Sequence, residues 1–180
     1  MIKPWEKIGQ QYIVAESQGK KFILQKYENP ITGNIIGFSA LEALDSAIIL
    51  ALTTYGDVIL SKEFKQGRDC VDIEVPGGAL DENETPQNTA VRELLEETGY
   101  KAGSIVLSLG YFWINGRNFK NKVHIFLSEG CTKIGNPQHH HDEITEIVLK
   151  PLEELKNLVF DGQINDPGTN MALIRAIKYL

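Results

Sequence analysis

Residues 78–100 read GALDENETPQNTAVRELLEETGY, and the rest of the chain is best understood from this stretch. It contains a spaced set of glycines, acids and one arginine: Gly78, Glu84, Arg92, Glu93, Glu96, Glu97 and Gly99, followed by Tyr100. Written as a pattern, the stretch is G-x5-E-x7-R-E-U-x-E-E-x-G-U, where U is a bulky apolar residue. A motif with this many fixed positions is far more specific than a short glycine-rich signature.

The same stretch predicts a helix from about Pro86 to Thr98. Thr85 is a good N-cap, and Pro86 suits the first helical position, where a missing N–H costs nothing. Gly99 suits the position just after the helix, where a positive φ is common. One apolar stripe of this helix should pack on the body of the domain: Val91, Leu94, Leu95 and Thr98.

A second face of the predicted helix gathers three carboxylates. Glu93, Glu96 and Glu97 stand at positions i, i+3 and i+4, so their side chains share one face. Like charges at this spacing repel each other, and hard cations such as Mg2+ or Mn2+ would remove the repulsion. The alternative is a solvated acidic face. Gly77 and Gly78 precede the helix in a tight loop where backbone carbonyls can approach a ligand closely.

The complete pattern resembles the Nudix box, with Tyr100 at a position that is usually aliphatic. This resemblance implies that Arg92 is a structural partner of Glu84 rather than a substrate contact. The metal ligands that it implies are the Gly77 carbonyl and the carboxylates of Glu93 and Glu97, with Glu96 assisting. The implied cofactor is Mg2+, with Mn2+ as a possible substitute.

Composition narrows the class of protein. The chain has 180 residues, 42% of them hydrophobic and 23% charged, as in an ordinary globular protein. We expect a cytoplasmic protein without a membrane span, because no apolar run reaches about 18 residues and the first residues lack a signal-peptide core. The two cysteines, Cys70 and Cys131, suggest no disulfide framework. A net charge of −6 argues against nucleic acid as a partner but not against a small nucleotide.

Two regions are expected along the chain, residues 1–45 and residues 46–180. After an irregular start over residues 1–10, three strand-like runs predict a small antiparallel sheet: Tyr12–Glu16, Lys21–Tyr27 and Ile35–Leu41. The run Ser46–Thr54 (SAIILALTT) is almost continuously apolar, so it predicts a central strand that is buried on both faces.

The remaining pattern predicts an α/β (α+β) fold, with a mixed sheet between helices in an α/β/α sandwich. Further strands are predicted at Val58–Phe64, Val71–Val75, Ser104–Phe112, Lys122–Ser128 and Ile144–Leu149. Gly130–His141 is expected to be a loop. Two more helices are predicted, Pro151–Val159 and Asp166–Tyr179.

Within the Nudix superfamily the chain looks most like the ADP-ribose pyrophosphatase group. The similar features are the N-terminal sheet, SKEFKQGRD ahead of EVPGG, and the tail PLEELKNLVFDGQI followed by a helix. The resemblance implies a homodimer that exchanges the N-terminal sheet. It also implies hydrolysis of a nucleoside diphosphate linked to another moiety, with ADP-ribose or another nucleotide sugar as substrate. The alternatives are a hydrolase of oxidised nucleoside triphosphates and a non-catalytic module that senses ADP-ribose.

The catalytic base has more than one candidate. Glu96 lies in the motif, whereas the ADP-ribose group often uses a glutamate from a later loop, which matches Glu143 best and Glu146 second. His139, His140 and His141 lie in that loop, and solvent exposure is weighed against a metal or substrate role. The expected substrate-binding residues are Lys65 and Arg68 for phosphate, Glu74 near the motif, and Phe112, which with Trp113 offers a ring for adenine or packs in the core.

Overall fold

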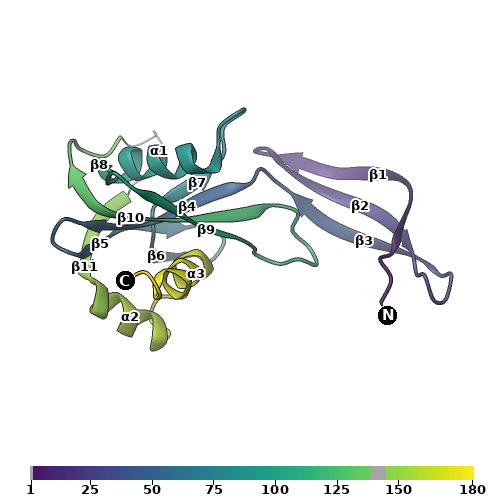
Figure 1. Ribbon diagram of the computed structural model, residues 1–180. Coiled ribbons are helices and arrows are strands. Elements are labelled where there is room, and N and C mark those ends of the chain that lie inside the picture. The colour runs from purple at the N-terminus through teal and green to yellow at the C-terminus, as the bar shows by residue number, and fades with distance from the viewer. Residues whose placement is uncertain (1, 139–144) are drawn as a thin grey trace. The chain divides into compact units, whose positions relative to one another are not determined.

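The computed structural model describes residues 2–138 and 145–180 (Figure 1). The chain forms two compact units, one of residues 1–44 with 113–122 and one of residues 45–112 with 123–180. Residues 113–122 lie in the first unit, where Phe119 bridges to Leu41 and Lys120 Nζ donates to Glu42 at 3.0 Å.

The first unit is a three-stranded antiparallel sheet in the order β1-β2-β3. Its strands are β1 (Glu6–Ser17), β2 (Lys20–Glu28) and β3 (Ile35–Glu42). The predicted N-terminal sheet is therefore confirmed. The expectation of an irregular start over residues 1–10 is wrong, because β1 begins at Glu6 and pairs there with Glu28.

The second unit is built on a larger mixed sheet, whose described strands follow the order β11-β5-β4-β10-β8. β6 lies beside β5, β7 beside β4 and β9 beside β10. β4 and β10 run parallel, whereas β4 and β5 run antiparallel. The bounds are β4 (Ser46–Thr53), β5 (Asp57–Lys65), β6 (Cys70–Glu74), β7 (Gly77–Ala79), β8 (Tyr100–Lys101), β9 (Val106–Trp113), β10 (Lys122–Lys133) and β11 (Thr145–Pro151).

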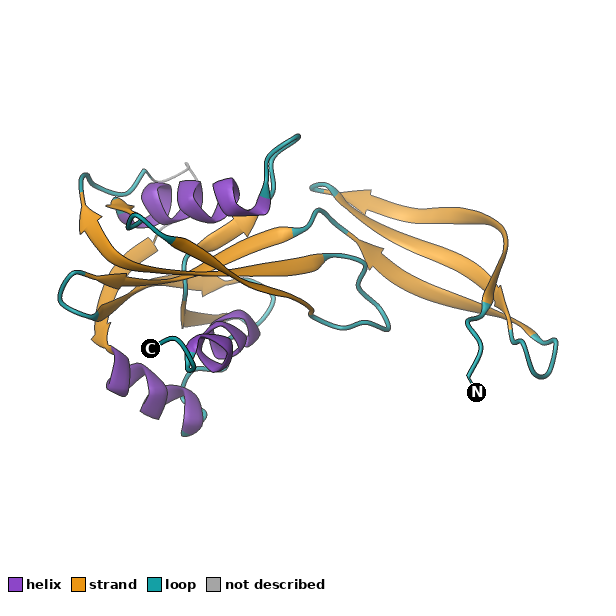
Figure 2. Cartoon of the chain, viewed as in Figure 1, coloured by secondary structure: helices purple, strands orange, loops and turns teal. Residues whose placement is uncertain are grey.

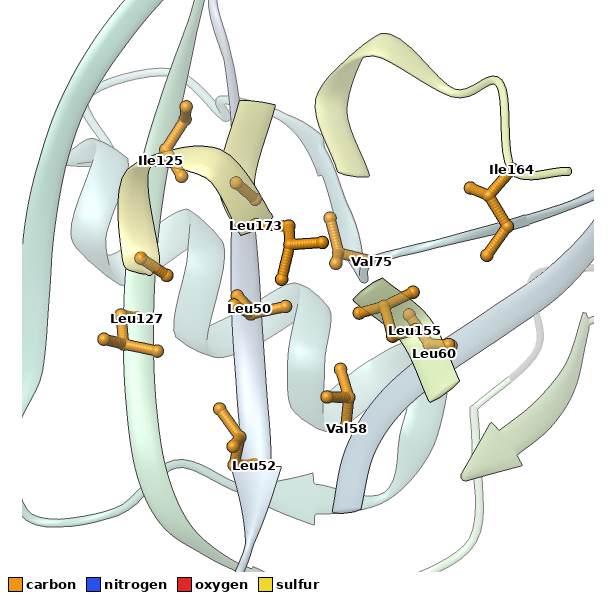
Figure 3. Close-up of a cluster of buried hydrophobic side chains, with 12 residues drawn as sticks. Leu50, Leu52, Val58, Leu60, Val75, Ile125, Leu127, Leu155, Ile164 and Leu173 are labelled. Carbon is orange, nitrogen blue, oxygen red and sulfur yellow. The ribbon is translucent and has the colours of Figure 1, made fainter. Parts of the chain in front are cut away.

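Helices cover both faces of this sheet (Figures 1 and 2). α1 (Pro86–Thr98) lies on one face, and α2 (Leu152–Phe160) and α3 (Pro167–Ala176) lie on the other. Alternate residues of β4 feed the two cores: Ile49 packs in the cluster that contains Leu94 of α1, and Leu50 packs in the cluster that contains Leu173 of α3 (Figure 3). The α/β/α sandwich and the doubly buried central strand are thereby confirmed.

Three short or extended elements differ from the sequence-based expectation. β10 continues to Lys133 through residues expected to be loop, because Thr132 and Lys133 pair with the short β8. β7 and β8 are too short to produce a recognisable alternation of polar and apolar residues. No helix in the described parts of the chain is long and apolar enough to cross a membrane.

Candidate active site

Helix α1 begins and ends as its sequence predicts. The Thr85 hydroxyl accepts a hydrogen bond from the Asn88 N–H at 3.3 Å, and Pro86 occupies the first turn. Gly99 adopts a φ of 71° and donates its N–H to the Leu95 carbonyl at 2.8 Å. The buried side is close to the predicted stripe and includes Leu94 and Thr98. The carboxylates lie on a neighbouring side of the helix and are themselves partly buried, since Glu93 is 15% and Glu96 29% exposed.

The three predicted carboxylates do come together on α1. Arg92 bridges two of them, since its Nη1 donates to Glu93 Oε1 at 2.8 Å and to Glu96 Oε2 at 2.9 Å. Glu97 lies deeper, and its Oε2 is buried without a hydrogen-bond partner among the described residues. Burial raises the pKa of Glu97 to about 9, and the charges of Glu93 and Glu74 act in the same direction. A buried carboxylate oxygen without a donor is the feature that a cation would satisfy.

Arg92 also organises the motif from its other side, as predicted. Its Nε and Nη2 donate to the two carboxylate oxygens of Glu84 at 3.1 and 3.0 Å, a bidentate arrangement. The hydrogen bond from Arg92 lowers the pKa of Glu84 to about 2. Glu84 in turn accepts from the Thr89 hydroxyl at 2.8 Å, so this acid ties the loop before the helix to the helix itself.

The glycine pair approaches these carboxylates closely. A Cβ at Gly78 would overlap the carboxylate of Glu93, and a Cβ at Gly77 would overlap the backbone of β4. Gly77 pairs with Ile48 of β4. A hydrogen bond from its N–H lowers the pKa of Glu97 and so offsets part of the rise that burial causes. β7 is therefore placed directly against the acidic face of α1, which only glycine at position 78 permits.

Lys65 and Glu74 form a partly buried charge network next to Glu97. Lys65 Nζ lies 2.7 Å from Glu63 Oε2 and 2.5 Å from Glu74 Oε1. Burial lowers the pKa of Lys65, but the hydrogen bonds to Glu63 and Glu74 outweigh burial and raise it to about 12. Burial raises the pKa of Glu74, and Lys65 offsets part of that effect. The structure thus gives Lys65 carboxylate partners inside the site, and Glu63 is a member of the network that the sequence pattern did not reveal.

The other predicted substrate contacts are Arg68 and Phe112, and their surroundings differ from those of Lys65 and Glu74. Arg68 pairs with Asp72 across the turn between β5 and β6, and 42% of its side chain is exposed. Phe112 is partly buried and packs against the core cluster on the α3 side of the sheet. Trp113 is 46% exposed, with Lys122 Nζ 5.5 Å from the centre of its ring.

The candidate base Glu143 lies outside the described residues, as do His139, His140 and His141. The flanking residues are described. Gln138 donates its N–H to the carbonyl of Glu96 at 2.7 Å, which ties the chain before residue 139 to the end of α1. The runner-up Glu146 lies in β11 with 70% of its side chain exposed, and it pairs with Lys62 at 3.2 Å.

Residues from α3 reach the site although no sequence pattern singled them out. A cavity of about 180 Å³ is lined by residues that include Ser46, Glu74, Gly77, Gly78, Asp166 and Gly168. Asp166 is the N-cap of α3, and its charge contributes to the raised pKa of Glu74. The only available signal was the helix start at Asp166-Pro167, which predicts a cap but not a position beside the glycine pair.

The carboxylate oxygens of these residues are suitable ligands for a divalent cation, provided that the Arg92 guanidinium moves from between Glu93 and Glu96. No group of three or more His, Cys, Asp or Glu side chains within residues 2–138 and 145–180 is already arranged to hold a metal ion. The geometry explains this, because the guanidinium of Arg92 lies between Glu93 and Glu96. Two features suit a hard cation with oxygen ligands: the Glu97 oxygen that has no partner among the described residues, and the close approach of Gly78 to the Glu93 carboxylate.

Comparison with known proteins agrees with this geometry. The family profile of the NUDIX domain matches residues 43–168. An ADP-ribose pyrophosphatase of Bacillus subtilis (strain 168) is 32% identical over 127 residues, which cover 69% of this chain and 68% of that protein. A GDP-mannose pyrophosphatase of Yersinia enterocolitica is 29% identical over 136 residues, which cover 71% of this chain and 70% of that protein.

A solved structure extends the likeness of the fold to the whole chain. The crystal structure of an ADP compounds hydrolase superposes with a TM-score of 0.85 and covers 100% of this chain and 96% of that one, at 19% identity. Fold, motif geometry and family profile agree, and the chain therefore belongs to the NUDIX domain family and is a Nudix pyrophosphohydrolase.

Proposed function

We propose that the protein hydrolyses the pyrophosphate bond of a nucleoside diphosphate linked to another moiety, in a reaction that depends on a divalent metal. The lead substrate is ADP-ribose, which would yield AMP and ribose 5-phosphate. One observation carries the proposal: Glu97 has a buried carboxylate oxygen that no described residue contacts by a hydrogen bond, and this oxygen lies beside Glu93 and the glycine pair. The pyrophosphatase relatives support the bond type, and their names include both ADP-ribose and GDP-mannose.

In this proposal the metal ligands are the Gly77 carbonyl, Glu93 and Glu97, with Glu96 assisting. The cofactor is Mg2+, with Mn2+ as a substitute, because both prefer oxygen donors. The bound ion would neutralise the phosphate oxygens and lower the pKa of a bound water. Arg92 donates to the carboxylates of Glu93 and Glu96, and it would keep Glu84 as its partner if those two carboxylates bound an ion instead.

The remaining groups bind substrate and move a proton. We assign the general base to Glu143 or Glu96, either of which would take a proton from the attacking water. Glu74 faces the cavity at the glycine pair and is the best placed of the proposed substrate contacts. A phosphate contact from Lys65 requires it to exchange a carboxylate partner, and the same holds for Arg68.

Phe112 has the weakest support as an adenine contact, because it packs against the core. The sensor alternative is disfavoured because each glutamate of the motif is present, three of them in contact with Arg92. Hydrolysis of oxidised triphosphates remains the competing activity for the test below.

We also propose a homodimer in which residues 1–45 contribute to the interface and residues 46–180 form the hydrolase region. β1 and β2 expose apolar side chains on one face, among them Tyr12 at 61%, Phe22 at 42% and Leu24 at 42%. Tyr12 lies directly opposite Leu24, so the two share that face. Exposed apolar patches of this kind are typical of interaction surfaces.

We propose in addition that the protein is cytoplasmic. Cys70 and Cys131 are free thiols, which is consistent with a reducing compartment.

The test is a product analysis with purified protein and Mg2+. ADP-ribose, GDP-mannose and an oxidised guanosine triphosphate are compared in parallel, each with and without excess chelator. We expect cleavage of ADP-ribose to AMP that stops with chelator. Preference for the triphosphate would select the competing activity, whereas binding of ADP-ribose without turnover would indicate a sensor. Full turnover in excess chelator would exclude the metal-dependent mechanism.

A further inference from the structure

The N-terminus of α3 is connected to the glycine pair by a buried hydroxyl. Thr169 is fully buried, and its hydroxyl uses both of its hydrogen-bonding roles. It donates to Asp166 Oδ2 at 2.8 Å and accepts from the Val75 N–H at 3.0 Å. Because the Val75 N–H can only donate, the hydroxyl proton points to Asp166 Oδ2. The same oxygen also accepts from the Thr169 N–H at 2.6 Å. The result is a chain of hydrogen bonds from Asp166 through Thr169 to the backbone of Val75.

Val75 occupies a sensitive position in the site. It follows Glu74, the last residue of β6, and only Val75 and Pro76 separate Glu74 from Gly77. The Pro76 carbonyl accepts from the Ile49 N–H at 3.0 Å, so this short connection is held at two points by residues outside it. One of the two anchors is the Thr169 hydroxyl. This hydroxyl therefore anchors the backbone between Glu74 and Gly77 to α3.

A second contact links α3 to the same connection through Ile48. A Cβ at Gly168 would lie 3.2 Å from Ile48 Cδ1, and a Cβ at Gly77 would lie 2.6 Å from Ile48 Cγ2. The Ile48 side chain thus fills the space between the start of α3 and Gly77, where neither neighbour has a side chain. A residue with the shape of threonine but without its hydroxyl, such as valine, would preserve this packing at position 169, because a methyl group occupies about the same space as the hydroxyl. What the hydroxyl adds is its two hydrogen bonds, one to Asp166 Oδ2 and one from the Val75 N–H.

We propose that Thr169 is a positioning residue of the active site, which acts through the Val75 N–H to orient the Gly77 carbonyl and the Glu74 carboxylate. The inference rests on the proposed metal-dependent function. It assigns to α3, which carries no motif residue, a share in forming the metal and substrate site. Loss of the hydroxyl leaves the buried Val75 N–H without its acceptor, and the connection must shift to find another one.

The test compares Thr169→Val, Thr169→Ser and Thr53→Val in the full chain. Valine keeps the shape and removes the hydroxyl, whereas serine keeps the hydroxyl and removes a methyl group. Thr53 is a matched control, because its buried hydroxyl also accepts from backbone N–H groups, those of Tyr55 and Asp57, in the β4–β5 turn. Mn2+ affinity is measured without substrate by calorimetry, and kcat, KM and thermal stability are measured alongside.

We expect Thr169→Val to weaken Mn2+ binding and kcat by about tenfold or more, as is typical when a group that orients a metal ligand is lost. Thr169→Ser should restore both values. Thr53→Val should lower the melting temperature without changing either. Should Thr169→Val not fold, Asp166→Ala removes the acceptor that directs the hydroxyl, and the same loss of Mn2+ affinity is expected.

Wild-type Mn2+ affinity and kcat in a folded Thr169→Val protein would overturn the role of Thr169 while leaving the proposed function intact. A change of equal size in Thr53→Val would overturn it too, because the effect would then be general destabilisation. A wild-type protein that binds no Mn2+ would instead overturn the proposed metal site, and the inference with it.

Discussion

At the scale of single residues, Glu97 is the member of the acidic face whose surroundings are least favourable to a charge. Its Oε2 is buried without a described partner, and burial raises its pKa to about 9. A protein does not maintain such a group for stability, since ionising it in this position costs free energy. The charge is useful only when a cation is present to balance it.

Replacement of Glu97 by glutamine should separate function from folding. The change keeps the shape and removes a carboxyl group whose ionisation is unfavourable in this position, so without added metal the protein should melt at the same or a higher temperature. We expect kcat and Mg2+ affinity to fall by roughly 100-fold or more, since even groups that only support a metal ligand cost 10–100-fold when they are lost. Near-normal kcat at saturating Mg2+ would remove Glu97 from the ligand set.

The identity of the base is decided by three glutamine substitutions. We expect Glu143→Gln to lower kcat by about 10^2–10^4-fold with little change in KM, because a general base acts in the transition state. Glu146→Gln serves as the control, because that side chain is 70% exposed and paired with Lys62. Thermal melts accompany the kinetics. Wild-type kcat in Glu143→Gln together with a large loss in Glu96→Gln would place the base on α1.

The Glu84–Arg92 pair predicts how stability responds to acid. The pKa of Glu84 is lowered to about 2, so its ion pair stabilises the fold at any pH above the ordinary glutamate pKa. That contribution is lost as the pH falls from about 4.5 towards 2, where the carboxylate protonates. Glu84→Gln should therefore melt below the wild type at pH 6, and the difference should shrink at pH 3.

The matched control for this acid effect is Glu153→Gln. Glu153 pairs with Lys156 but is 79% exposed. Exposed pairs of this kind contribute little to stability. A difference between Glu84→Gln and the wild type that stays constant from pH 6 to pH 3 would show that the pair does not act through its charge.

At the scale of elements, the site depends on how closely β7 approaches α1. Gly78 leaves the space that the Glu93 carboxylate occupies, and the pairing of β7 with β4 fixes the distance between strand and helix. A short strand of three residues with almost no side chains is a weak element by itself. Its value lies in exposing backbone groups next to the carboxylates.

Gly78→Ala should accordingly damage the site more than the fold. Its Cβ would overlap the Glu93 carboxylate and force that side chain away. We expect Mg2+ affinity and kcat to fall by roughly 10–100-fold. Gly67→Ala is the control, because a Cβ at Gly67 meets no atom within 4 Å. Unchanged metal binding in a folded Gly78→Ala protein would mean that Glu93 can move without consequence.

At the scale of the whole molecule, the three-stranded sheet is a small unit with apolar side chains in contact with solvent. Contiguous apolar side chains that face solvent are typical of interaction surfaces. Burying the face that carries Phe22 and Leu24 in a homodimer would remove these side chains from solvent. The proposed dimer thus rests on this exposed apolar face.

Leu24→Lys should shift the protein from dimer to monomer in light scattering at micromolar concentration. A lysine on this face places a charge in the proposed interface, which is costly without a partner. Ile31→Lys is the control, since Ile31 is 86% exposed in the turn between β2 and β3. A wild-type protein that is already monomeric at this concentration would contradict the interface.

The sequence by itself determined the bounds of α1, the face that carries Glu93, Glu96 and Glu97, and the burial of β4 on both faces. Each of these follows from interactions within a few residues: a Thr85 cap, a Gly99 stop, a helical repeat and a continuous apolar run. Such local rules act the same way in any tertiary context that does not oppose them.

Only the tertiary structure decided what the carboxylates face. The contact of Gly78 with Glu93 and the hydrogen bond from the Val75 N–H to Thr169 join residues of different elements. Thr169 follows Val75 by 94 positions, and no periodic pattern records that pairing. These contacts exist because the packing of α1 and α3 on opposite faces of one sheet brings them together, and that packing is a property of the folded chain as a whole.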